Sequence, residues 1–115
     1  MWLTPGSQIW LCAQPVDMRL GFDGLAGKVG ELLAISPFEG HCFIFRNKRG
    51  NRLKLLAWDG LGFWLLARRL DQGRFHWPRA SGERVELSAG QWALLTEGRA
   101  WQALPSLQKC TPSLL

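Results

Sequence analysis

Two apolar runs, of which the second alternates with polar residues, are separated by a polar segment and restrict most strongly how this chain can fold. The first run is residues 41–46 (HCFIFR) and the second is residues 52–58 (RLKLLAW). Side chains that alternate in character are typical of a strand whose two faces meet different environments. In the segment between them, 47–51 (NKRGN), Gly50 or one of the asparagines can take the positive φ of a tight turn. The sequence therefore predicts a β-hairpin.

Apolar segments on either side of the hairpin predict further strands. Residues 8–13 (QIWLCA) form a short one, closed by the following Gln-Pro step. After a turn at residues 59–60 (DG), residues 63–70 are predicted as a strand, although their even hydrophobicity also fits a helix. Two short edge strands are also predicted, over 73–77 and 84–87.

Helical periodicity follows the first strand. Apolar residues recur at three- and four-residue steps: Phe22, Leu25, Ala26, Val29, Leu32 and Leu33. The segment ends at residues 36–37 (SP). Gly24, Gly27 and Gly30 weaken helicity by about 1 kcal/mol each relative to alanine. Their regular spacing predicts a stripe that packs closely against a sheet.

A second helix is predicted near the C-terminus. Ser88 is its N-cap, Trp92, Leu94 and Leu95 are its apolar side, and Gly98 is its C-terminal stop. The predicted fold is α+β: an antiparallel β-meander of about four to six strands, with one helix after the first strand and one C-terminal helix. Residues 1–101 are predicted to form a single domain, and residues 102–115 a loosely ordered tail.

Positive charge is concentrated in the middle of the chain. The net charge is +5 over 115 residues. Between Arg46 and Arg79 there are nine basic residues against Asp59 and Asp71, whereas the rest of the chain has five basic and seven acidic residues. A local excess of this size indicates an anionic partner, of which nucleic acid is the commonest.

The basic hairpin and its neighbours are the predicted DNA-binding residues. They are Arg46, Lys48, Arg49, Arg52, Lys54, Arg68, Arg69 and Arg74. Clustered arginines and lysines suit contacts with phosphates, which make affinity steeply dependent on salt. Trp58, Trp64 and Trp77 would stack on bases if they were exposed. The alternative is an ordinary charged turn on the surface, with the tryptophans in the core.

Signals for catalysis or a metal are weak. Asp17 fits a helix cap, and Asp23 and Asp59 stand in DG pairs typical of turns, so converging carboxylates for metal chemistry are not expected. His41 and His76 lie far apart in the sequence without patterned cysteines. Phosphate-binding loops and nucleophile motifs are absent from the sequence. We therefore expect no catalytic residue, metal site, cofactor or small-molecule substrate.

The cysteines and the hydropathy suggest where the protein works. Cys12, Cys42 and Cys110 are an odd number and widely spaced, which fits reduced thiols. The N-terminus does not resemble a signal peptide, and no apolar stretch reaches the ~18 residues of a membrane span. We expect a cytoplasmic protein with no membrane contact.

Three motifs, in order along the chain, carry a resemblance to a known family. They are VDMRLGFDGL (16–25), SPFEGHCFIFRNKRGNRLKLLAWDGLGFWLLARRLDQGRFHWP (36–78) and ELSAGQWALLTEG (86–98). Together they resemble the TnpB, or Orf2-like, accessory proteins of the insertion-sequence sixty-six family of bacterial transposable elements. The resemblance covers nearly all of the predicted domain. It implies a role in DNA transposition beside a separate DDE-type transposase, and it offers no established catalytic residues.

Two hypotheses for the molecular role follow. In the first, the protein is a non-catalytic factor that grips the DNA backbone through its basic hairpin and neighbouring arginines. In the alternative, it is an interaction module that docks on the transposase or on another accessory protein of the element. For that role the predicted interaction residues are Arg19, Trp58 and Trp77.

Overall fold

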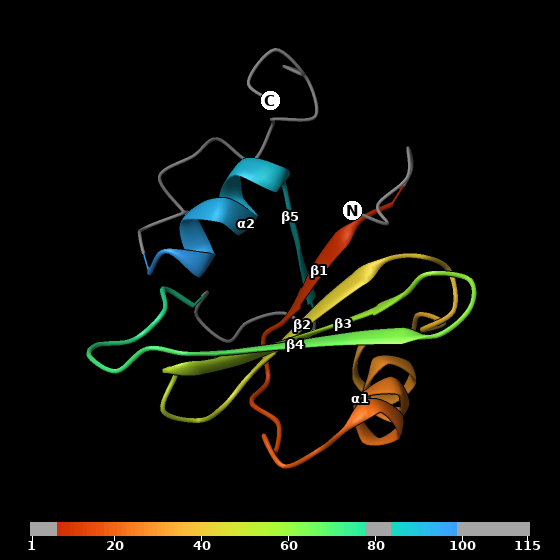
Figure 1. The fold of residues 1–115 in the computed structure, drawn as a ribbon, viewed down its shortest axis with the longest axis horizontal. Helices are drawn as coiled ribbons and strands as arrows, with labels where there is room; N and C mark the ends of the chain where they lie inside the picture. The colour runs from red at the N-terminus through yellow and green to blue at the C-terminus, as the bar shows by residue number, and fades with distance from the viewer. Residues whose placement is uncertain (1–6, 78–83, 99–115) are drawn as a thin grey trace.

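A five-stranded sheet with one helix on each face forms the described part of the chain (Figure 1). The computed structural model describes residues 7–77 and 84–98. The elements in chain order are β1 (Ile9–Cys12), α1 (Phe22–Lys28), a π-helical continuation η1 (Val29–Leu33), β2 (Cys42–Arg46), β3 (Arg52–Trp58), β4 (Phe63–Arg69), β5 (Arg84–Leu87) and α2 (Ala89–Thr96). The predicted α+β class, the number of strands and both helices are confirmed.

The sheet is mixed, with strand order β4-β3-β2-β1-β5. The consecutive strands β2, β3 and β4 pair antiparallel, as a meander does. However, β1 pairs with β2 in parallel, because the chain crosses over through α1 and η1 before it returns to the sheet. β5 then pairs antiparallel with the other side of β1. The meander therefore describes one half of the sheet, and a helical crossover joins that half to β1.

Each face of the sheet has its own hydrophobic core. On the α1 face, the helical segment buries Leu25, Val29 and Leu33 against a group that includes Phe43 and Leu56. On the α2 face, Leu95 and Phe75 pack against residues of β1, β2 and β3: Leu11, Ile44 and Leu55. The alternation expected for the hairpin is confirmed, since neighbouring residues of β3 enter different cores.

The glycine stripe does not pack against the sheet, so that prediction was wrong. Gly27 and Gly30 are exposed, and a Cβ added to either would meet nothing within 4 Å. At Gly24 the three described atoms nearest to an added Cβ all belong to the side chain of Leu20, which lies in the loop before the helix and not in the sheet. The helical segment instead faces the sheet through its large apolar side chains at four-residue steps, Leu25, Val29 and Leu33.

Residues 73–77 do not form the predicted edge strand. The segment folds back on the hairpin loop, where the backbone N–H of Phe75 and the indole Nε1 of Trp77 both donate to the carbonyl of Gly50, at 2.8 and 2.9 Å. A single carbonyl serves both donors, so no ladder of hydrogen bonds develops. Phe75 is anchored by burial in the α2-face core.

The remaining local predictions agree with the structure. Residues 63–69 form a strand and not a helix. Ser88 caps α2 through a capping box with Gln91, and Gly98 follows the helix with φ of 73°. Gly50 has φ of 76°, as the tight hairpin requires. The predicted C-terminal tail, 102–115, lies outside the described residues.

Candidate nucleic-acid interface

Strand pairing brings most of the predicted DNA-binding residues to one end of the sheet. β2 ends at Arg46, β3 begins at Arg52 and β4 ends at Arg69, and because these neighbours are antiparallel the three positions lie at the same end. The hairpin loop 47–51 and the loop 70–77 lie at that end too, on the left in Figure 1. We call this region the basic end.

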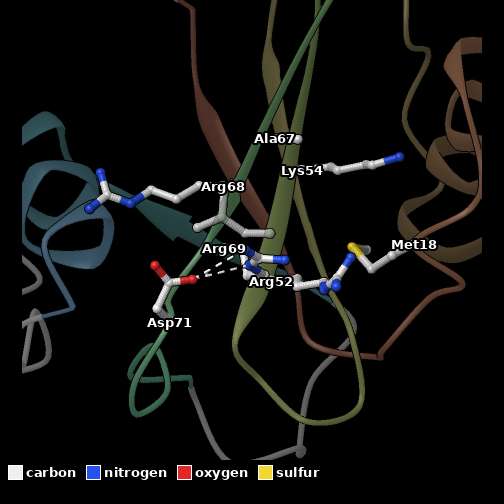
Figure 2. Close-up of a pocket in the computed structure, with 8 residues that line it drawn as sticks. Met18, Arg52, Lys54, Ala67, Arg68, Arg69 and Asp71 are labelled. Carbon is white, nitrogen blue, oxygen red and sulfur yellow. Dashed lines mark hydrogen bonds and ion pairs between the residues drawn. The ribbon is translucent and has the colours of Figure 1, made fainter.

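Within the basic end, the cations are divided between the two faces. Arg52 of β3 stands directly opposite Arg69 of β4, on the α1 face, and Lys54 follows two positions along β3 on that face. Arg68 stands opposite buried Leu53, so it belongs to the α2 face. Figure 2 shows Arg68 extending away from Arg52 and Arg69. Lys48, Arg49 and Arg74 lie in the loops, where all three are exposed.

A pocket of about 350 Å³ opens beside the α1-face cations (Figure 2). Its lining comprises Met18, Arg52, Leu53, Lys54, Ala67, Arg68, Arg69 and Asp71. Asp71 is the single carboxylate among the described residues that line it, and it pairs with Arg69 at 3.2 Å. Among residues 7–77 and 84–98, no carboxylate pairs with Arg52. The pocket therefore carries net positive charge.

A second pocket, of about 440 Å³, lies against the hairpin loop. Its lining comprises Arg46, Lys48, Arg49, Gly50, Arg74, Phe75, His76 and Trp77. Among its described lining residues are four of the predicted DNA-binding residues and no carboxylate. Its aromatic floor is held in place by the hydrogen bond from Trp77 to Gly50.

Two of the predicted DNA-binding residues, Arg46 and Lys54, donate to backbone carbonyls of distant segments. The guanidinium of Arg46 donates to the carbonyl of Ala13 from Nε at 2.9 Å and from Nη2 at 2.7 Å, and partial burial lowers its pKa. Lys54 Nζ donates to the carbonyl of Leu20 at 2.9 Å. These cations fasten the segment between β1 and α1 to the hairpin, so their charges are partly engaged.

The predicted interaction residues do not form one surface. Arg19 is highly exposed and forms a two-pronged ion pair with Asp17, with Nη2 2.8 Å from Oδ2, and this pair lowers the pKa of Asp17 to about 2. Trp77 is half-buried at the basic end. Trp58 lies at the opposite end of β3, among aromatic rings.

The sequence interpretation missed two contributors to the α1-face pocket. Met18 lines the pocket from the loop before α1, and Asp71 pairs with Arg69 across its rim. Asp71 was visible in the sequence as an acid two positions after Arg69, a spacing that allows contact when the strand ends between them. Nothing in the periodicity around Met18 indicates its position.

Comparison with known proteins decides the family. The family model described as IS66 Orf2 like protein (TnpB_IS66) matches residues 7–106. The chain belongs to the IS66 Orf2-like family. It is thus an accessory protein of IS66 transposable elements, and the resemblance drawn from its motifs is confirmed.

Two relatives of this IS66 Orf2-like protein come from Sinorhizobium fredii (strain NBRC 101917 / NGR234). The uncharacterized protein y4hO is 40% identical over 95 residues, which cover 83% of each chain. The uncharacterized protein y4jC is 38% identical over 96 residues, which cover 84% of this chain and 82% of the relative. No solved structure matches.

Other kinds of site are not evident in the described part of this IS66 Orf2-like protein. Within residues 7–77 and 84–98, no three histidine, cysteine, aspartate or glutamate side chains gather where they could hold a metal ion. Across the same ranges, no helix is long and apolar enough to cross a membrane. Cys12 and Cys42 are buried, and burial raises the pKa of the Cys12 thiol, which keeps it protonated. Cys110 lies outside these ranges.

Proposed function

We propose that this IS66 Orf2-like protein binds the DNA phosphate backbone through its basic end, and that the chemistry of transposition is performed by a separate transposase. The observation that carries the proposal is the cross-strand pair of Arg52 and Arg69. Like charges directly opposite each other on neighbouring strands repel, and Asp71 offsets only one of them. A phosphate oxygen near both guanidiniums would remove the repulsion and gain two charge-assisted hydrogen bonds.

Exposure supports the same use for most of the other predicted residues. Six of the eight are exposed: Lys48, Arg49, Arg52, Arg68, Arg69 and Arg74. Arg46 and Lys54 are partly buried and bonded to backbone carbonyls. The proposed contact surface therefore consists of the hairpin tip and the ends of β3 and β4 at the basic end, and the two partly buried cations stabilise the loops beside it.

The arrangement favours contact with the backbone over reading of bases. Trp77 is tied to the hairpin by its hydrogen bond, and Trp58 packs edge-on against Phe63 with centroids 4.9 Å apart. Trp64 is half exposed, but it lies at the opposite end of β4 from Arg69. Phosphate contacts alone carry no sequence information, so we propose binding with weak sequence preference.

A salt titration with charge-reversal variants tests the proposal. Purified protein is titrated against a labelled duplex of the element end at several salt concentrations. Contacts with four or five phosphates give a slope of log affinity against log salt of about −4. Arg49→Glu combined with Arg52→Glu is expected to weaken binding uniformly across DNA sequences. Failure to bind at low salt, or binding that salt does not weaken, contradicts the proposal.

A matched control variant distinguishes the effect of charge at the basic end from the effect of the net charge of the protein. Lys28→Glu makes the same change in charge as Arg52→Glu, but it lies in α1, where Lys28 pairs with Glu31 at 3.3 Å. We expect Lys28→Glu to reduce affinity much less than Arg52→Glu. Equal losses would mean that net charge, and not the basic end, determines binding.

The end of the sheet opposite the basic end supports a second candidate function, docking on a protein. Phe38, Trp58, Leu61 and Phe63 lie there, and we call it the aromatic end. There Phe38 is 57% exposed and Leu61 is 94% exposed. Phe38 packs against Trp58 and Phe63, with centroids 5.1 and 5.4 Å away. Exposed apolar groups gathered in this way are typical of contact surfaces for other proteins.

A pull-down with the element's transposase in the presence of nuclease tests this candidate. A complex that survives nuclease treatment and is lost in Phe38→Ser would support direct docking through the aromatic end. Loss of the wild-type complex after digestion would show that DNA had bridged the two proteins. Binding of DNA by the basic end and docking by the aromatic end are compatible, because the two ends are separated by the length of β3.

A further inference from the structure

β4 is an edge strand that lacks the usual protection against pairing. It ends the strand order of the sheet, and among the described residues only β3 pairs with it. Its sequence, FWLLARR, contains no proline or glycine, and its charges are confined to the last two positions. Natural sheets usually block such edges with proline, bulges or charges along the strand. Within the described residues nothing pairs with the free side of this seven-residue strand, so it is a surface able to accept another strand.

The side chains of β4 are also unusually exposed for apolar residues in a sheet. Trp64 is 49% exposed and Leu66 is 46% exposed, and both lie on the α2 face. Leu65 and Phe63, on the α1 face, are only half-buried. Both faces therefore offer apolar area at the edge that a neighbouring strand would cover.

We propose that β4 pairs antiparallel with β4 of a second copy of this chain, with the twofold axis at Leu66. An antiparallel pair centred there places opposite each other Phe63 and Arg69, Trp64 and Arg68, and Leu65 and Ala67. Directly opposite residues share a face of the sheet, so Trp64 and Arg68 meet on the α2 face and Phe63 and Arg69 on the α1 face.

β4 is complementary to a reversed copy of itself. This favours a second copy of the chain as the pairing partner, and it favours one alignment of the two strands. One end of β4 is aromatic and the other end is cationic, so reversal of a second copy brings each arginine against a ring of its partner. Moving the twofold axis by one residue to Leu65 would place Phe63 opposite Ala67 and leave both arginines without an aromatic partner. Moving it to Arg68 would set two like charges face to face. Of these three positions, only an axis at Leu66 places both arginines of one copy opposite the aromatic residues of the other.

The resulting dimer is a continuous sheet with defined geometry. The two basic ends would point in opposite directions along the paired strands, about 20 Å apart, because positions 63 and 69 are separated by six antiparallel residue steps. Both copies of α1 would lie on one face and both copies of α2 on the other. This inference concerns the assembly of the chain and stands whether or not the basic end binds DNA.

Reciprocal charge variants at the twofold axis provide the test. Sedimentation of the wild type from micromolar to millimolar concentration should show the mass doubling. Leu66→Lys and Leu66→Asp, each alone, should remain monomeric, because two like charges then face each other. An equal mixture of the two variants should recover the doubled mass. Phe22→Lys, at a position 49% exposed in α1, is the matched control and should dimerise as the wild type does.

A wild type that stays monomeric throughout, or a dimer that persists in both Leu66 variants, overturns the proposal. The register is tested separately with Leu66→Cys in a Cys110→Ser background, since Cys12 and Cys42 are buried. Cysteines that face each other across a twofold axis lie within disulfide range. Leu61→Cys is the control, because Leu61 is 94% exposed yet lies outside the paired segment. Faster cross-linking at position 61 than at position 66 would contradict the register.

Discussion

At the scale of single residues, Gly50 joins the hairpin to the segment that folds over it. Its φ of 76° belongs to the left-handed region, and its carbonyl accepts from both Phe75 and Trp77. A Cβ at this position would stand 2.9 Å from Trp77 Nε1. We predict that Gly50→Ala lowers the free energy of unfolding by about 1–3 kcal/mol, from backbone strain and loss of this contact. Denaturant unfolding would measure the loss: the midpoint should fall, while the dependence of the free energy of unfolding on denaturant concentration stays the same.

The ion pair of Asp17 and Arg19 gives a second prediction at this scale. The hydrogen bonds and charge of Arg19 lower the pKa of Asp17 from 3.8 to about 2. Because the folded pKa is depressed, the pair stabilises the fold above the ordinary pKa and loses its effect as pH falls from about 4 to 2. We expect Arg19→Gln to return the titration midpoint of Asp17 towards 3.8, measured by NMR of the carboxyl carbon. An unchanged midpoint would show that the pair does not persist in solution.

At the scale of elements, the sequence predicted what neighbouring residues determine. The hairpin, β4 and the cap at Ser88 follow from alternation, a turn glycine and a capping pattern, and all are close in sequence. The parallel pairing of β1 and β2 and the fold-back of residues 73–77 depend on contacts between distant segments. Periodicity carries no information about such contacts, so these features were not predictable in the same way.

The same distinction applies to the candidate site: some of its features depend on residues that are close in sequence, and others depend on contacts between distant segments. Charge counting located the basic end, because its residues are close in sequence or in adjacent strands. It did not reveal that Arg46 and Lys54 are bonded to loop carbonyls, since their acceptors, Ala13 and Leu20, lie 33 and 34 positions away. Which face an arginine occupies also required the register, as Arg68 and Arg69 illustrate.

Helix α1 supplies the prediction that belongs to an element. Gly27 lies inside the helix and is exposed, with open space where a Cβ would stand. Alanine loses less conformational freedom than glycine on forming a helix. We therefore predict that Gly27→Ala raises the free energy of unfolding by about 0.5–1 kcal/mol, the opposite sign to the same substitution at Gly50. Destabilisation by Gly27→Ala would mean that the glycine stripe has a contact beyond the described residues.

At the scale of the whole molecule, the two faces of the basic end differ in their capacity for phosphate. On the α1 face, Arg52, Lys54 and Arg69 are neighbours around one pocket. On the α2 face, Arg68 stands opposite the apolar residue Leu53, and Arg46 is turned towards a backbone carbonyl. Among the strand residues, leaving aside the loop pocket formed with Lys48, Arg49 and Arg74, a phosphate on the α1 face would therefore meet more cations than one on the α2 face.

Adjacent residues of β4 make this asymmetry measurable, because Arg69 and Arg68 point to opposite faces. We predict that Arg69→Gln weakens DNA binding several-fold and makes the slope of log affinity against log salt shallower by about one unit. Arg68→Gln removes the same charge one position away, so it controls for net charge, and its effect should be clearly smaller. The affinity and the salt slope of both variants would be compared by titrating each against the same duplex over a range of salt concentrations. Equal effects would place the phosphate at the rim of the sheet, where both arginines reach it and where both line the pocket, and would contradict the predicted preference for the α1 face.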